Sequence, residues 1–304
     1  MADEAAFVNL ADITEIELLI LRRMRAVTLG QHRSTAHGSG FDFHGLRDWQ
    51  PGDRPSSIDW AQSTLTNNSP LLVREFEQPS TAVVTAIADV SASTRCGVGD
   101  TPIAALIARA IATIGMSAVF FQDPFGIVTF DEGFRHLAGI RPRSGKRHLV
   151  RCVDAYQYGR SLEAEPRVGD ISTALAAHIR STALLPVISD FLFENPEEIL
   201  RELSLLNQTH DVFLVLIDSS YAFELPATSA SWVQTIDADT GRSRTMARSD
   251  FMQLSARVRE WQAYVRGMAR DLDLDVVSLG PDKTQADIAL AEFVAERRLR
   301  KTHP

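Results

Sequence analysis

Oxygen-bearing side chains follow directly after a buried apolar run. Residues 82–93 read AVVTAIADVSAS, so the run ends in Asp89, Ser91 and Ser93. Such a run, bounded by polar turn-forming residues, predicts a buried strand. One carboxylate and two hydroxyls at alternate positions are hard donors of the kind that Mg²⁺, Ca²⁺ and Mn²⁺ prefer. The same residues also suit a simple turn or helix cap, so the motif alone leaves both interpretations open.

A second acidic side chain follows another apolar run. Residues 183–189 (ALLPVIS) predict a buried strand, and Asp190 comes directly after it. Parallel strands present their carboxyl ends at one edge of a sheet, where ligands bind in open α/β folds. We therefore expect Asp190 to converge with Asp89, Ser91 and Ser93 in a metal site. Asp218, after the apolar run 211–217, is a weaker candidate.

Other catalytic motifs fail on their spacing. The stretch Ser144–Arg147 (SGKR) is similar to a phosphate-binding loop, but Ile140 stands where that loop requires glycine. The chain has neither a Gly-x-Gly-x-x-Gly motif nor a Gly-x-Ser-x-Gly elbow. Nothing supplies a nucleophile, a base and an orienting group together, so we predict that the protein is not an enzyme. The alternative is a metal-dependent phosphohydrolase that uses the same acidic edge.

Strands and helices alternate from residue 82 to the end of the sequence. This order predicts an α/β domain over residues 81–304, with a doubly wound, mainly parallel sheet of Rossmann-like type. The first 80 residues differ in character. Apolar residues at helical spacing predict a helix within residues 11–27, residues 30–54 are predicted to be mostly loop, and residues 71–77 alternate as in a strand. Residues 1–80 are therefore predicted to form an N-terminal helix, a loop and a small β extension.

Composition restricts the function further. The net charge of −8 over 304 residues argues against broad nucleic-acid binding, and two cysteines are too few for a zinc ribbon or a disulfide framework. The longest apolar run, Ile103–Val119, is interrupted by polar residues and predicts no membrane span. The first ten residues, MADEAAFVNL, lack the basic region of a secretory signal. A cytoplasmic location is therefore expected.

The strand-end oxygens resemble those of a von Willebrand factor A domain. That family holds a divalent cation through an Asp-x-Ser-x-Ser motif and a late Asp, which here match Asp89, Ser91, Ser93 and Asp190. The resemblance implies Mg²⁺, or Mn²⁺ or Ca²⁺, at this site. The upstream residues are similar to the bacterial family called domain of unknown function 58, through the stretches Arg47–Asp53, Ile58–Trp60 and Leu71–Phe76.

The resemblance departs from the family pattern at the middle metal ligand. The family has a Gly-Thr-Asp run, whereas this chain has Val168-Gly169-Asp170, so Gly169 occupies the threonine position and Asp170 or Ser172 would substitute. The resemblance implies a protein-binding module, an adaptor or co-chaperone for a MoxR-type AAA+ ATPase. An acidic residue of a target protein would complete the coordination of the cation. A degenerate, metal-free scaffold is the alternative that Gly169 favours.

Overall fold

The chain divides into two compact units in the computed structural model. One unit combines Met1–Thr28 with Ala82–Pro304, and the other is Leu29–Thr81. The helix α1 (Leu10–Gln31) therefore groups with the sheet, whereas the sequence placed it with the extension over residues 1–80. The reason is that its apolar face, with Ile13, Ile16 and Ile20, is buried in the hydrophobic core of the sheet. The structure describes residues 6–31, 42–51, 53, 55, 58–65, 70–77, 82–98, 101–131, 133–159, 165–179, 181–193, 195–223, 232–236 and 243–302.

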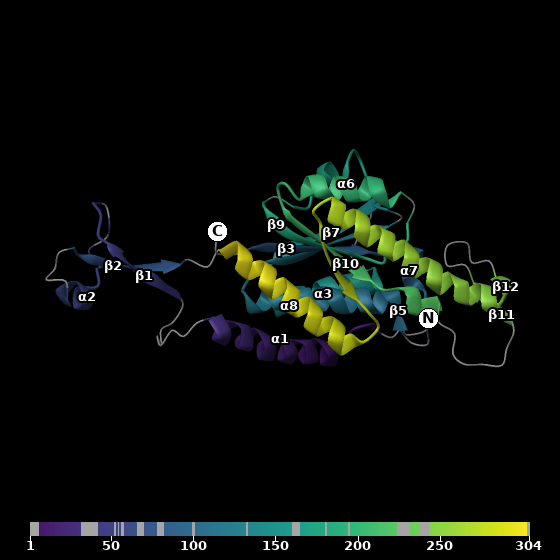
Figure 1. Cartoon of the computed structure of the whole chain (residues 1–304), viewed down its shortest axis with the longest axis horizontal. Helices are drawn as coiled ribbons and strands as arrows, with labels where there is room; N and C mark the ends of the chain where they lie inside the picture. The colour runs from purple at the N-terminus through teal and green to yellow at the C-terminus, as the bar shows by residue number, and fades with distance from the viewer. Residues whose placement is uncertain are drawn as a thin grey trace. The chain divides into compact units, whose positions relative to one another are not determined.

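A seven-stranded sheet forms the centre of the larger unit (Figure 1). Its strand order is β13-β10-β9-β3-β6-β7-β8. The five strands from β13 to β6 run parallel, and the pairs β6–β7 and β7–β8 are antiparallel. The prediction of an α/β class with a mainly parallel sheet is therefore confirmed. The strands span Asp275–Leu279 (β13), Asp211–Ile217 (β10), Ala183–Ser189 (β9), Val83–Asp89 (β3), Phe125–Asp131 (β6), His136–Arg143 (β7) and Glu165–Pro166 (β8).

Helices cover both faces of this sheet. One face packs against α1, α3 (Ile103–Phe120), α4 (Lys146–Tyr158) and α8 (Lys283–Thr302). The other face packs against α5 (Ile171–Ala176), α6 (Pro196–Leu206) and α7 (Arg248–Asp271). Along β3, Ala86 and Ala88 face the first layer and Ile87 faces the second. A strand buried on both sides is mostly apolar on both faces, which explains the near-continuous apolar runs in the sequence.

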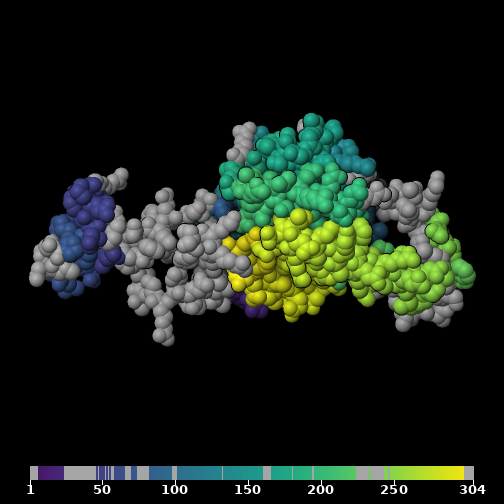
Figure 2. All heavy atoms as spheres, turned by 45° about the horizontal axis from the view of Figure 1, so that its top comes forward, coloured from purple at the N-terminus to yellow at the C-terminus, as the bar shows by residue number. Residues whose placement is uncertain are grey.

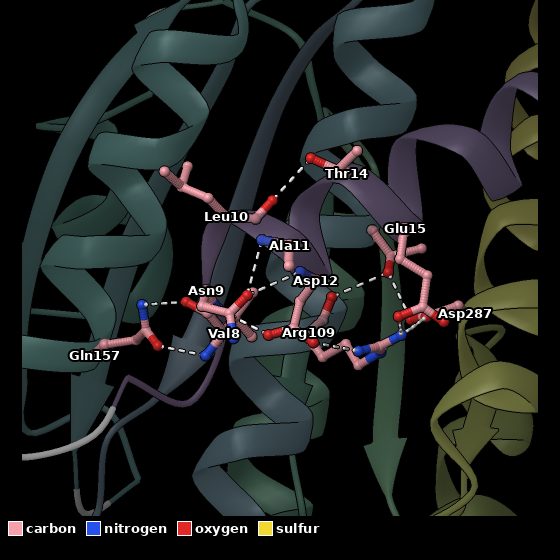
Figure 3. A network of polar contacts seen from close by, with 11 residues as sticks. Val8, Asn9, Leu10, Ala11, Asp12, Thr14, Glu15, Arg109, Gln157 and Asp287 are labelled. Carbon is pink, nitrogen blue, oxygen red and sulfur yellow. Dashed lines mark hydrogen bonds and ion pairs between the residues drawn. The ribbon is translucent and has the colours of Figure 1, made fainter.

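The helix α3 lies at the centre of the first layer. By length and composition it is apolar enough to cross a membrane, although polar residues interrupt it. In the structure 89% of this stretch is buried inside the protein, as in the core helix of a globular domain. Its one charged residue, Arg109, is paired with Asp287 of α8, and Asp12 and Glu15 of α1 lie beside it (Figure 3). Pairing of this kind is what a buried cation requires.

The smaller unit contains an antiparallel pair of strands and a short helix. β1 (Asp42–Asp48) pairs with β2 (Leu72–Glu77), and α2 (Trp60–Leu65) lies between them in the chain. β1 falls within residues 30–54, which were predicted to be mostly loop, so the loop prediction is wrong at residues 42–48. The pairing with β2 makes a strand of a sequence whose own pattern does not indicate one. Residues 32–41 of that predicted loop lie outside the described part of the chain.

Two small hairpins complete the larger unit. β11 (Trp232–Ile236) and β12 (Ser243–Ala247) are antiparallel, and α7 begins at the residue after β12. Figures 1 and 2 show this hairpin at the N-terminal end of α7, where it projects beyond the sheet. β4 (Gly97–Val98) pairs with β5 (Thr101–Pro102) just before α3. Short 3-10 helices follow the central strands β3 and β10, at Ala92–Arg95 and Ser220–Phe223.

Candidate metal centre

The carboxyl ends of β3 and β9 meet at one edge of the sheet. These strands are parallel neighbours, with Ala88 opposite Ile188, so the residues that follow each strand lie side by side. The Ser189 hydroxyl donates a hydrogen bond of 2.5 Å to Asp89 Oδ2. The structure therefore brings the Asp89 carboxylate into contact with Ser189, the residue that directly precedes Asp190.

Asp89 organises the turn that follows β3. Its Oδ1 accepts hydrogen bonds from the Ser91 backbone N–H at 2.8 Å and from the Ser91 hydroxyl at 2.5 Å. The hydroxyl oxygens of Ser91 and Ser93 are 3.1 Å apart. Ser91 occupies the N-cap position of the 3-10 helix, yet its side chain makes no capping bond to that helix. The Ser91 hydroxyl is thus bonded to the carboxylate and the Ser93 hydroxyl lies next to that of Ser91, so the turn gathers three oxygen-bearing side chains in one place.

Asp190 is a buried carboxylate with one unpartnered oxygen. Its side chain is 1% exposed, and Oδ1 accepts a 3.2 Å hydrogen bond from the Leu192 N–H. Oδ2 is buried and has no hydrogen-bond partner within the described residues. A buried polar atom left without a partner costs about 1–3 kcal/mol, and more when it is charged. Such an atom at the end of a central strand is a candidate position for a ligand or a bound proton.

Burial and repulsion by neighbouring carboxylates set the electrostatics of this edge. Burial raises the pKa of Asp190 to about 7, and the nearby charge of Asp89 contributes to the rise. Burial also raises the pKa of Asp89, although hydrogen bonds from Ser189 and Ser91 oppose this effect. Among the described residues, no lysine or arginine forms an ion pair with either carboxylate. Two carboxylates and two hydroxyls without a cationic partner fit a hard divalent cation, which would supply the missing positive charge.

The backbone of this edge is held by residues that the sequence did not indicate. Tyr156 of α4 is buried, and its hydroxyl donates a 2.9 Å hydrogen bond to the Asp89 carbonyl oxygen. Trp261 and Gln262 of α7 donate to the carbonyl oxygens of Phe191 and Asp190, at 2.9 and 3.0 Å. The local sequence around an aromatic or amide residue on an amphipathic helix does not indicate which backbone group it will bond. Here each partner lies more than fifty residues away in the sequence.

Asp170, which was also predicted as a metal ligand, lies at the start of α5. Asp170 caps α5 by accepting a 2.7 Å hydrogen bond from the Thr173 N–H. Hydrogen bonding by the Thr173 side chain, and then by its backbone, lowers the pKa of Asp170. No contact joins Asp170 to Asp89 or Asp190 in the described part of the chain. Within the same residues, no group of three His, Cys, Asp or Glu side chains is arranged to hold a metal ion. A cation at this edge would therefore depend on the serine hydroxyls in addition to Asp89 and Asp190.

Gly169 explains why threonine is absent from the position before Asp170. Its φ is +79°, a left-handed conformation that β-branched side chains rarely adopt.

The weaker candidate, Asp218, accepts a 3.0 Å hydrogen bond from the Ser220 N–H. Burial raises the pKa of Tyr221 to about 12, and the charges of Asp190 and Asp218 add to this rise. Asp218 thus lies at the same edge as Asp190 but is engaged in its own turn.

Comparisons with known proteins assign a family and give distant structural likenesses. The profile of the family described as "Protein of unknown function DUF58" matches residues 45–291. Uncharacterized proteins of Mycobacterium tuberculosis and Mycobacterium bovis are 26% identical over 300 residues, which covers 95% of this chain and 89% of theirs.

Three solved structures are similar at low sequence identity. The protein BatB of Bacteroides thetaiotaomicron is 13% identical, with a TM-score of 0.37, over 72% of this chain and 99% of that one. An aerotolerance-related membrane protein of Bacteroides fragilis is 8% identical, with a TM-score of 0.39, over 71% and 99%. The pilus adhesin SpaC of Lactobacillus rhamnosus is 9% identical, with a TM-score of 0.37, over 74% and 31%.

Proposed function

The chain belongs to the DUF58 family of proteins of unknown function, as its sequence predicted, and we propose that it is a non-enzymatic protein-interaction module of the von Willebrand factor A type. In this proposal Asp89, Ser91, Ser93 and Asp190 hold a divalent cation, Mg²⁺ or its substitutes Mn²⁺ and Ca²⁺. The observation that carries the proposal is the buried Asp190 oxygen without a partner, beside a second carboxylate whose pKa is also raised by burial.

The exposure of the four side chains supports an open position on the cation. Asp89 and Asp190 are each 1% exposed, whereas Ser91 and Ser93 are half-buried at the rim. A cation bound between them would have the carboxylates on its inner side and an approach from solvent near the serines. A carboxylate of another protein would enter there as a further oxygen ligand, since divalent cations of this kind take six or more oxygens.

The partner and the location follow from the resemblance. A MoxR-type AAA+ ATPase is the proposed partner, and an acidic residue of the ATPase or of its target supplies the carboxylate. The protein then acts as an adaptor or co-chaperone in the assembly or activation of that target. The cytoplasm, where such an ATPase has access to ATP, is the proposed location.

The test combines metal binding with partner binding. Asp89→Ala and Asp190→Asn are expected to abolish the heat of Mg²⁺ or Mn²⁺ binding in titration calorimetry while circular dichroism stays native. Both variants, and wild type with excess chelator, are expected to lose capture of the MoxR-type ATPase from the same organism. The matched control is Asp154→Ala, an exposed acid of α4. Unchanged capture in both variants and under chelator would overturn the proposal.

A metal-free scaffold is the second candidate, and the loop before α5 favours it. Gly169 has no side chain to offer a cation, and Asp170 is engaged in capping α5. A scaffold would show no heat with Mg²⁺, Mn²⁺ or Ca²⁺ and would bind its partner equally well in chelator. The same calorimetry and capture experiment therefore separates the two candidates.

A further inference from the structure

The segment after Asp190 is held by two adjacent side chains of α7. The Trp261 indole N–H donates to the Phe191 carbonyl oxygen at 2.9 Å. The Gln262 amide nitrogen donates to the carbonyl oxygens of Asp190 and Ile217, at 3.0 and 2.8 Å. These carbonyls stand at the ends of the neighbouring strands β9 and β10. One helix thus fixes both the backbone that carries the Asp190 carboxylate and the strand beside it.

Gln262 is a polar side chain in a buried position, which packing alone does not require. The residue is 3% exposed and lies on the same helix as the buried apolar residues Val265 and Ala269. Its amide also lies 3.2 Å from the Ser219 hydroxyl, so it has three acceptors at the sheet edge. An apolar residue here would fill the space but leave strand-end carbonyls unsatisfied, which is costly in a buried site.

The backbone that Trp261 holds is in a rarely populated conformation. Phe191 has a φ of +55°, which is uncommon for a residue other than glycine and persists only where neighbouring groups enforce it. This residue directly follows Asp190, whose Oδ2 is buried without a partner. The direction of that carboxylate therefore depends on a turn that α7 keeps in place.

We propose that Trp261 and Gln262 are positioning residues for Asp190, so that the cation affinity of the edge follows the position of α7. The inference rests on the proposed function for the affinity itself. The positioning is a property of the metal-free protein as well, because the hydrogen bonds are made to the backbone of residues 190 and 191. Partners that orient a metal ligand typically change metal affinity by about 10–100-fold when they are removed.

The test uses the full chain with Trp261→Phe and Gln262→Met. Gln262→Met removes the donor at a similar side-chain volume, and Trp261→Phe removes the donor while keeping an aromatic ring of smaller size. We expect Mg²⁺ or Mn²⁺ affinity to fall about tenfold in calorimetry. In metal-free protein, hydrogen exchange of residues 190–192 is expected to become faster, since the Leu192 N–H is bonded to Asp190 Oδ1. The matched control is Tyr264→Phe, which removes a hydrogen bond from the same helix to Glu197.

Two outcomes would overturn the inference. One is wild-type exchange in residues 190–192 of both variants; the other is cation affinity equal to that of the Tyr264→Phe control. A merely structural role would lower the unfolding temperature and leave both readouts unchanged. If wild type binds no cation, the proposed function fails, and the exchange measurement alone decides whether α7 positions Asp190.

Discussion

The Asp190 carboxyl is the residue on which the chemistry of the sheet edge depends. It is buried, it faces the charge of Asp89, and one of its oxygens has no partner within the described residues. Without a cation the proton is the simplest way to neutralise it, which is why its pKa rises to about 7. A cation and a proton therefore compete for the same carboxyl group.

This competition predicts how the stability of metal-free protein depends on pH. The pKa of Asp190 is raised from 3.8 to about 7, so the folded state holds a proton that the unfolded state has lost. The contribution to stability is complete below the unfolded pKa and is lost as the pH rises through about 7. The urea concentration at the unfolding midpoint should therefore decrease as the pH is raised from about 5 to about 8.

Asp190→Asn provides the comparison for this titration. The amide cannot ionise, so the variant should lose less stability than wild type over the same pH interval. Urea unfolding followed by circular dichroism, in chelator, measures both slopes. Parallel slopes for wild type and Asp190→Asn would show that Asp190 does not titrate as its burial indicates.

The sequence predicted the oxygen-bearing residues of the candidate site but not the residues of α4 and α7 that hold its backbone. Asp89, Ser91, Ser93 and Asp190 follow apolar runs whose strands are adjacent, so sequence order and parallel pairing suffice to bring them together. The roles of Tyr156, Trp261 and Gln262 depend on how α4 and α7 lie across the sheet faces, which no local pattern encodes. Asp170 was predicted as a ligand on resemblance, but the turn after Gly169 directs it to the N-terminus of α5.

Among the elements, α3 shows how a buried cation ties helices together (Figure 3). Arg109 Nε donates a 2.8 Å hydrogen bond to Asp287 of α8, and the Thr113 hydroxyl donates to the other oxygen of that carboxylate at 2.8 Å. Burial raises the pKa of Asp287, whereas the hydrogen bond and charge of Arg109 lower it. Asp12 and Glu15 of α1 lie 3.5 Å from the guanidinium. One side chain thus joins α1, α3 and α8.

Breaking this pair from one side should destabilise the protein strongly. Arg109→Met leaves the Asp287 carboxylate buried without its partner, which costs about 3–5 kcal/mol. The double variant Arg109→Met with Asp287→Leu replaces both charges by apolar groups and should recover most of that loss. Urea unfolding measures the free energies.

An exposed ion pair on α1 and α8 is the matched control for the buried one. Arg23 and Glu292 are 3.3 Å apart, and both side chains are about half exposed. Arg23→Ala should cost no more than about 1 kcal/mol, as is usual for surface pairs. Equal losses for Arg109→Met and Arg23→Ala would contradict the role given to burial.

Strands could be predicted from the sequence where burial on both faces makes them continuously apolar. β9 and β10 coincide with the apolar runs 183–189 and 211–217, because a central strand must be apolar on both faces. β1 was not predictable, because its sequence, DFHGLRD, has neither alternation nor a continuous apolar run. Its conformation comes from the pairing with β2, a contact between segments that are far apart in the chain.

At the scale of the molecule, the chain contains two units with separate interiors. Both large hydrophobic clusters are formed by described residues before Thr28 and after Ala82. The smaller unit, Leu29–Thr81, contributes none of the described residues in these clusters. Among the described residues, the core that supports the candidate site is therefore formed by the larger unit.

This separation predicts that the smaller unit can be removed. Replacing Leu29–Thr81 by a flexible Gly/Ser linker should leave the sheet folded, with a cooperative thermal transition within a few degrees of wild type. Differential scanning calorimetry and circular dichroism test this expectation. Loss of the cooperative transition would mean that the sheet unit depends on residues 29–81 for its stability.

The burial of α3 also has a consequence for the order in which the protein is made. This helix is apolar enough to enter a membrane, and its covering layer includes α8. α3 ends at Phe120, but α8 begins only at Lys283, so most of the chain is synthesised while one side of α3 lacks its final cover. The growing chain therefore carries α3 with the side that faces α8 still uncovered. We expect chaperones that bind exposed apolar segments to bind this chain until α8 has been made.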